Sequence, residues 1–141
     1  MRQGFTLPEL LSVIAIAGIV LAIATPPLSR ALDRAAVTES VDRFAALHAT
    51  ARQLAIARNT LARLEVDPAR RAATLSVRRS PTVWDSVGRY DLGSATMACS
   101  NPTLIFGPLG LGYGTSNSRV IFARGAAADT VTTSRTGRLR R

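Results

Sequence analysis

The chain has 141 residues, of which 18 are basic and 9 are acidic, so its net charge is +9. This length allows one domain with a core of modest size. All 18 cations are arginines, and the single cysteine, Cys99, excludes a disulfide within the chain. A secreted domain held together by disulfides is therefore excluded, and we expect Cys99 to be a buried or half-buried apolar residue.

The first 28 residues are strongly apolar. In the stretch 10–24 only a serine and a glycine are not plainly apolar. As a helix, residues 5–28 would measure about 36 Å, which exceeds the roughly 30 Å of a bilayer core. A secretory signal peptide is the alternative interpretation, with a weak cleavage region at "AIATPPL". The carboxylate of Glu9 fits that alternative poorly, because the apolar core of a signal peptide should begin there.

The segment "GFTLPELL" resembles the class III signal of type IV pilins and type II secretion pseudopilins. The resemblance implies a leader of residues 1–4, cleavage by a prepilin peptidase between Gly4 and Phe5, and N-methylation of Phe5. It also implies a partner for Glu9, the N-terminal amine of a neighbouring subunit. A carboxylate inside a membrane segment is costly and usually has such a partner.

Downstream of the apolar segment, residues 28 to about 59 have the periodicity of an amphipathic helix. We expect Pro26 and Pro27 to kink or briefly open the helix before it resumes. His48 borders the apolar stripe and is the chain's only histidine, so it is interpreted as a partly buried core residue and not as a metal ligand. The stripe consists of Val37, Val41, Phe44, Leu47, Ala51 and Leu54.

The second half of the chain reads as short strands and loops. Strands are predicted near 62–66 and 74–79, joined by a turn at Asp67-Pro68, and further strands at "TVWDSV", 120–122 and 131–133. "GLGYGTS" lacks the helix and lysine of a phosphate-binding loop, so its glycines are interpreted as loop and bulge residues. The sequence has no pair of catalytic carboxylates, no cluster of residues with the spacing of metal ligands, and no nucleophile with a partnered base. We therefore expect no enzymatic activity, metal site or cofactor.

Three later segments resemble the GspH and FimT branch of minor pilins and pseudopilins: "ARQLAIARNTLARLEV", "FGPLG" and "TGRLRR". The resemblance implies an α+β, pilin-like fold in which a long N-terminal helix packs on a small antiparallel sheet. It implies a leader (1–4), a transmembrane and assembly half of the helix (5–28) and a periplasmic domain (29–141), with the helix continuing to about residue 60. The expected location is the bacterial inner membrane, in a single pass, and the expected partners are other pilin or pseudopilin subunits.

The basic character belongs to the second half, because residues 70–141 hold 11 arginines and 3 acids. Four of these arginines lie within the last seven residues, which contain no acid. Arginine forks suit bidentate phosphate contacts, so a non-specific DNA-backbone partner is predicted, as the FimT resemblance implies for natural transformation. A solvated basic terminus and a purely structural, GspH-like subunit of a secretion pseudopilus tip are the alternatives. The predicted DNA-binding residues are Arg135, Gly137, Arg138, Arg140 and Arg141.

Overall fold

The computed structural model describes residues 6–114 and 116–141, without the side chains of residues 23–27. The chain divides into two compact units, Met1–Leu32 and Asp33–Arg141. The second is called the globular unit below. All the buried residues of the hydrophobic core belong to it, so this unit has a core of its own.

The longest element is helix α1, Leu7–Ala57, which passes from the first unit into the second. It is continuous through Pro26 and Pro27, so the local opening expected there does not occur; each proline removes one donor, and the helix continues on both sides. The helix ends at Ala57, and Asn59, two residues further on, has a left-handed φ of +47°. Thr60 N–H donates to the Ala55 carbonyl at 3.1 Å, the bond that closes a Schellman cap.

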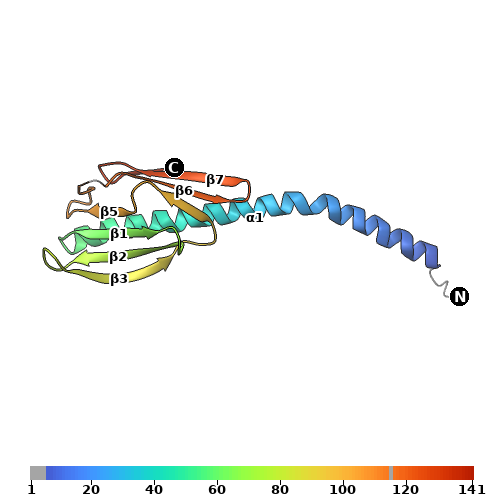
Figure 1. Ribbon diagram of the computed structural model, residues 1–141, viewed down its shortest axis with the longest axis horizontal. Helices are drawn as coiled ribbons and strands as arrows, with labels where there is room; N and C mark the ends of the chain where they lie inside the picture. The colour runs from blue at the N-terminus through green and yellow to red at the C-terminus, as the bar shows by residue number, and fades with distance from the viewer. Residues whose placement is uncertain (1–5, 115) are drawn as a thin grey trace. The chain divides into compact units, whose positions relative to one another are not determined.

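The globular unit contains two four-stranded antiparallel sheets (Figure 1). The first has the order β3-β2-β1-β5 and the second the order β4-β6-β7-β8. The predicted single small sheet is therefore wrong in number, although the predicted hairpin of β1 and β2 is present. Strand β5 pairs with β1, and β4 pairs with β6, so strands that are distant in the chain become neighbours. The local alternation of apolar and polar residues does not encode such pairings. The bounds are β1 Ala62–Asp67, β2 Ala72–Arg78, β3 Trp84–Asp91, β4 Thr96–Cys99, β5 Thr103–Phe106, β6 Ser118–Arg124, β7 Ala127–Thr133 and β8 Leu139–Arg140.

One core joins α1 to both sheets. Phe44 on the helix lies with its ring centroid 5.9 Å from that of Phe122 on β6, and both side chains are fully buried. The predicted stripe is confirmed, except that Leu54 is only partly buried while Ala55 is buried. The strands contribute alternate residues to this core, as expected for sheets with one face against a helix. These include Leu64, Leu75, Leu104, Phe106, Val120, Phe122 and Val131.

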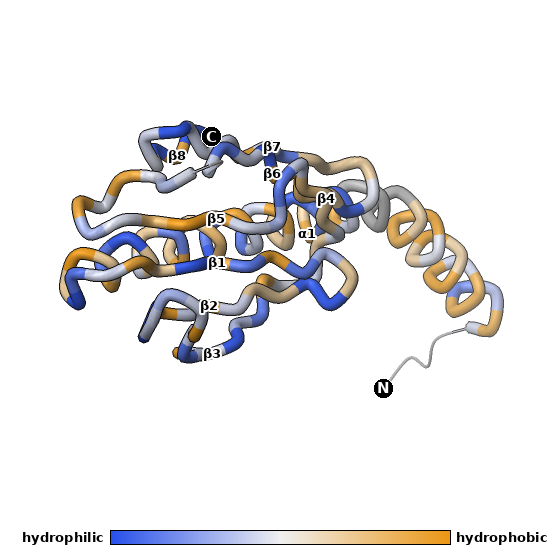
Figure 2. The backbone as a smooth tube through the Cα atoms, turned by 60° about the vertical axis from the view of Figure 1, so that its left-hand side comes forward, coloured by the Kyte–Doolittle hydropathy of each residue, from blue (hydrophilic) through white to orange (hydrophobic). Residues whose placement is uncertain are grey.

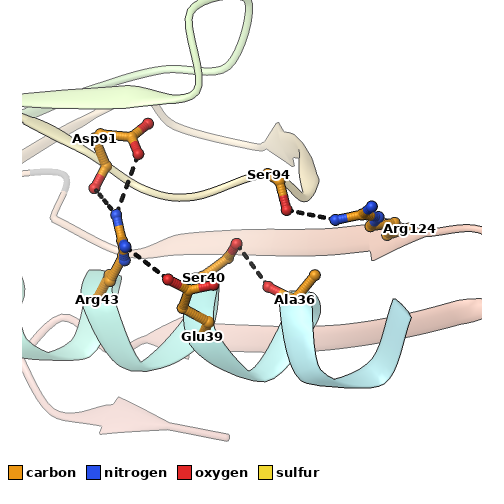
Figure 3. A network of polar contacts seen from close by, with 7 residues as sticks. All are labelled: Ala36, Glu39, Ser40, Arg43, Asp91, Ser94 and Arg124. Atoms are coloured by element: carbon orange, nitrogen blue, oxygen red, sulfur yellow. Dashed lines mark hydrogen bonds and ion pairs between the residues drawn. The ribbon is translucent and has the colours of Figure 1, made fainter. Parts of the chain in front are cut away.

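Polar contacts fix the helix to the strands at its exposed side (Figure 3). The Arg43 guanidinium lies 2.6 Å from Glu39 Oε1 on the same helix and 3.1 Å from Asp91 Oδ2 at the end of β3. Because these side chains are about half exposed, each ion pair contributes at most about 1 kcal/mol. Their main effect is to set how the end of β3 lies along α1.

The two hairpin turns of the second sheet lie at opposite ends of the globular unit. The β6–β7 turn contacts the start of the unit, where Arg124 Nε is 3.3 Å from Asp33 Oδ1. The loop 107–114, called the glycine loop, contacts the other end of the helix, where Arg52 Nε–H donates to the Gly110 carbonyl at 2.8 Å. The helix between residues 33 and 52 is about 28 Å long. The β7–β8 turn contacts the glycine loop and so lies at this far end.

Candidate functional site

Gly4 and Phe5, the predicted processing residues, lie outside the described residues. Glu9 is described, in the first turn of α1. Its Oε2 atom lies 3.4 Å from the backbone nitrogen of Thr6, the residue that precedes the helix. This is half of a capping box, in which a glutamate at the third helical position accepts from the N-cap N–H. The pattern T-x-x-E of "TLPE" carries that signal, which our sequence interpretation did not use.

The N-terminal part of α1 consists mostly of apolar residues, which are orange along the tube in Figure 2. Nine of them between residues 7 and 21 are 54–75% exposed within this chain. A helix that is apolar all round requires an apolar environment or a packed assembly. Among the described residues, no helix meets the combined length and hydropathy of a membrane crossing.

The predicted DNA-binding residues form a hairpin, β7 and β8 joined by the loop 135–137, which we call the tail hairpin. Thr133 pairs with Leu139, Thr132 pairs with Arg140, and Ser134 N–H donates to the Arg138 carbonyl at 2.9 Å. A three-residue loop of this kind ends in a left-handed residue. Gly137 supplies it, with a φ of +73°. Gly137 therefore makes a tight backbone turn between the two strands.

Strand alternation separates the arginines of the tail hairpin into two groups. Arg138 and Arg140 flank Leu139, which packs against the core, so both arginines lie on the outer, solvent face. Within the part of the chain that the structure describes, neither their side chains nor that of Arg135 makes an ion pair. The three guanidinium groups are therefore available to an external anion.

Arg141 differs from the other tail arginines because carboxylates hold it. Its Nε atom lies 2.6 Å from Asp129 Oδ2, and its Nη1 atom lies 3.5 Å from Asp42 Oδ1 on the helix. Asp129 belongs to the inward series of β7, so Arg141 joins the end of β8 to α1. Arg141 is therefore paired with acids of this chain, in contrast to Arg138 and Arg140.

The tail hairpin packs directly on the glycine loop. A Cβ built on Gly137 would lie 3.0 Å from the backbone nitrogen of Gly112 and 3.4 Å from the ring of Phe106. A Cβ on Gly112 would overlap the carbonyl oxygen of Arg135. The segments "FGPLG" and "TGRLRR", which are distant in the sequence, thus form one packed unit at the far end of the globular unit.

Two titratable residues are structural. His48 is buried, and its ring lies edge-on to Phe106 with centroids 4.9 Å apart. Burial, with a smaller effect of Arg52, lowers the pKa of His48 to about 4, so it is neutral at physiological pH. Burial also raises the pKa of Cys99, which favours its inert thiol form. In the described ranges, no cluster of histidine, cysteine and carboxylates could hold a metal ion.

Comparisons with known proteins agree with this architecture. Residues 1–25 match the prokaryotic N-terminal methylation motif. The type IV minor pilin FimU of Pseudomonas aeruginosa PAO1 is similar in structure, with 14% identity over 74% of this chain and 86% of that chain and a TM-score of 0.61. The minor pseudopilin EpsH of the type 2 secretion system of Vibrio cholerae is also similar in structure, with 15% identity over 74% of this chain and 94% of that chain and a TM-score of 0.61. No curated protein matches the chain.

The motif confirms the predicted prepilin-type N-terminus, and the fold likeness confirms the predicted α+β, pilin-like class. The chain therefore combines the N-terminus of a prepilin-type protein with the fold of minor pilins and minor pseudopilins.

Proposed function

We propose that the chain is a minor type IV pilin, held in the bacterial inner membrane by its N-terminal helix and assembled into pili after prepilin peptidase cleaves the Gly4–Phe5 bond. The methylation motif at residues 1–25 and the all-round apolar surface of the first part of α1 support this proposal. The globular unit would then occupy the periplasm, with its far end directed away from the point where the chain enters it.

Processing gives the first test. Cleavage at Gly4–Phe5 removes four of 141 residues and leaves 137, beginning with N-methylated Phe5. Replacing Gly4 by valine is expected to abolish cleavage, so the membrane fraction should contain only the uncut chain. Mass spectrometry of the extracted protein measures both forms. A terminus after Ala24 would instead indicate an ordinary signal peptide and would overturn the proposal.

We further propose that the tail hairpin binds the DNA backbone without sequence preference, in the uptake of DNA for natural transformation. The observation that carries this proposal is the placement of Arg138 and Arg140 on one outer strand face, free of ion pairs within the described residues. Neighbouring guanidinium groups on a fixed strand suit bidentate contacts to successive phosphates. The position of the hairpin at the far end of the globular unit keeps it clear of the helix entry point.

DNA binding is expected to depend steeply on salt, because each arginine–phosphate contact releases counterions. For the full chain in a nonionic detergent, replacing Arg138 and Arg140 together by glutamine should lower affinity for duplex DNA. It should also reduce the slope of log K against log salt by roughly two contacts at about 0.9 each. Fluorescence anisotropy over a salt series measures both quantities.

The matched control replaces Arg30 and Arg34, two exposed arginines of α1, and removes the same charge. Equal weakening by both double variants would mean that only net charge matters and that the tail hairpin is no site. Absence of binding at low salt in the wild-type chain would contradict the DNA proposal as a whole.

The second candidate is a structural minor pseudopilin of a type II secretion system. The packing of Gly137 against Gly112 favours it, because that contact explains why a glycine stands at position 137 without any bound ligand. The likeness to EpsH is also in keeping with it. In that case, the double replacement of Arg138 and Arg140 would leave both DNA affinity and subunit incorporation unchanged.

A further inference from the structure

Arg119 lies in one cross-strand row with Arg140 of the tail hairpin, which is 21 positions away in the sequence. On β6 it pairs with Thr132 of β7, which pairs in turn with Arg140 of β8. Neighbouring strands are about 4.8 Å apart, so two strand spacings place the backbones of Arg119 and Arg140 roughly 10 Å apart. This row crosses three strands of the second sheet.

The side chains of the row share the outer face of the sheet. Arg119 is exposed, whereas its neighbours Ser118 and Val120 are buried, so it alternates outward as Arg140 does on β8. Within the described part of the chain, the Arg119 guanidinium makes no ion pair or hydrogen bond. Asp129, the acid of β7, lies in the inward series, where Arg141 holds it.

A cavity of about 320 Å³ adjoins Arg119 and is walled by hydroxyl and amide groups. Two hydrogen bonds fix one wall, since Ser100 N–H donates to the Arg119 carbonyl at 3.0 Å and Arg119 N–H donates to the Ser100 hydroxyl oxygen at 2.9 Å. Thr133 lines the cavity too, but its hydroxyl is buried and, like Asp129, belongs to the inward series of β7. The lining contains no carboxylate and consists of Ser100, Asn117, Ser118, Arg119, Thr132 and Thr133.

We propose that Arg119 and this cavity form a second phosphate subsite for nucleic acid, continuous with the tail hairpin; this inference rests on the DNA binding proposed above. An exposed guanidinium beside the exposed hydroxyl of Ser100 and away from acids matches a phosphodiester, which offers charged oxygens and accepts several hydrogen bonds. The DNA surface is then a face of the second sheet, running from the β7–β8 turn across β7 to β6, and not the tail alone.

The test compares three variants of the full chain in nonionic detergent with duplex DNA over a salt series. Arg119→Gln is expected to lower affinity and to reduce the log–log salt slope by about 0.9, the value for one phosphate contact. Arg119→Lys keeps the charge, so it should retain the slope while losing part of the affinity of the bidentate fork. Arg34→Gln is the matched control, because it removes one exposed charge from the helix.

The outcomes separate this inference from the proposed function. If Arg119→Gln behaves like Arg34→Gln while the double replacement of Arg138 and Arg140 weakens binding, the subsite is absent and the tail hairpin acts alone. If the wild-type chain binds no DNA at low salt, the proposed function fails and this inference fails with it. Circular dichroism of Arg119→Gln checks the fold, which we expect to be unchanged because its described hydrogen bonds are all from backbone atoms.

Discussion

Replacing Gly112 by alanine is expected to lower the free energy of unfolding of the globular unit by about 1–3 kcal/mol, the range for overpacking a close-packed site. The added Cβ would overlap the Arg135 carbonyl oxygen and lie 2.9 Å from the Cβ of Ser116. Neither neighbour is free to move, since one is backbone and Ser116 is buried, with its hydroxyl donating to the Ile105 carbonyl at 2.8 Å. Thermal or denaturant unfolding of the full chain measures the loss.

Gly107→Ala is the control from the same loop. A Cβ at position 107 would meet only the Leu111 carbonyl oxygen, at an ordinary contact distance of 3.8 Å. We therefore expect its stability to stay within about 0.5 kcal/mol of the wild-type value. An equal loss in the two variants would contradict the specific packing of Gly112 against the tail hairpin.

This packing separates two roles within the run Gly137-Arg138-Leu139-Arg140 of the tail hairpin. Gly137 has a structural role, because its positive φ would strain a residue with a side chain and a Cβ there would be tight against Gly112. Arg138 and Arg140 have no such role, since they face solvent without an ion pair among the described residues. The DNA binding proposed above therefore depends on Arg138 and Arg140 and not on Gly137.

The fold was predictable where the signal is local. The stripe from Val37 to Ala51 follows helical spacing, and that spacing is enough to place those side chains in a core. The hairpin of β1 and β2 followed from alternation around a proline turn at Asp67. Both features depend on residues a few positions apart, so no knowledge of the remaining chain was needed.

The rest depends on contacts between distant residues. Arg141 pairs with Asp42, 99 positions away. The sequence does not reveal this ion pair, so Arg141 was predicted to bind DNA together with arginines that make no ion pair. Arg119 comes close to Arg140 only through the register of β6, β7 and β8. In the sequence it is a single isolated arginine, so nothing there predicted that it would lie near the tail. The division into two sheets has the same cause, because β5 leaves its sequence neighbours to pair with β1.

Glu9 has two possible reasons to be present, and they predict different behaviour for two substitutions. Within the chain it accepts from the Thr6 N–H at 3.4 Å, which stabilises the start of α1. In the proposed filament, its charge would pair with the N-terminal amine of a neighbouring subunit. Glutamine serves as well as glutamate in a capping box but carries no charge. Alanine removes both the cap and the charge.

We expect Glu9→Gln and Glu9→Ala both to be cleaved normally and both to be lost from filaments. Removing one member of a pair in an apolar environment leaves the other charge uncompensated and costs about 3–5 kcal/mol, enough to lower incorporation at least about tenfold. Immunoblots of sheared filaments against the membrane fraction measure it. Glu39→Gln is the control, because Glu39 pairs with Arg43 on the exposed side of α1, and it should incorporate as the wild type does. Normal incorporation of Glu9→Gln beside failure of Glu9→Ala would assign Glu9 to helix capping and remove the proposed charge pair, since only the charge distinguishes glutamate from glutamine at this position.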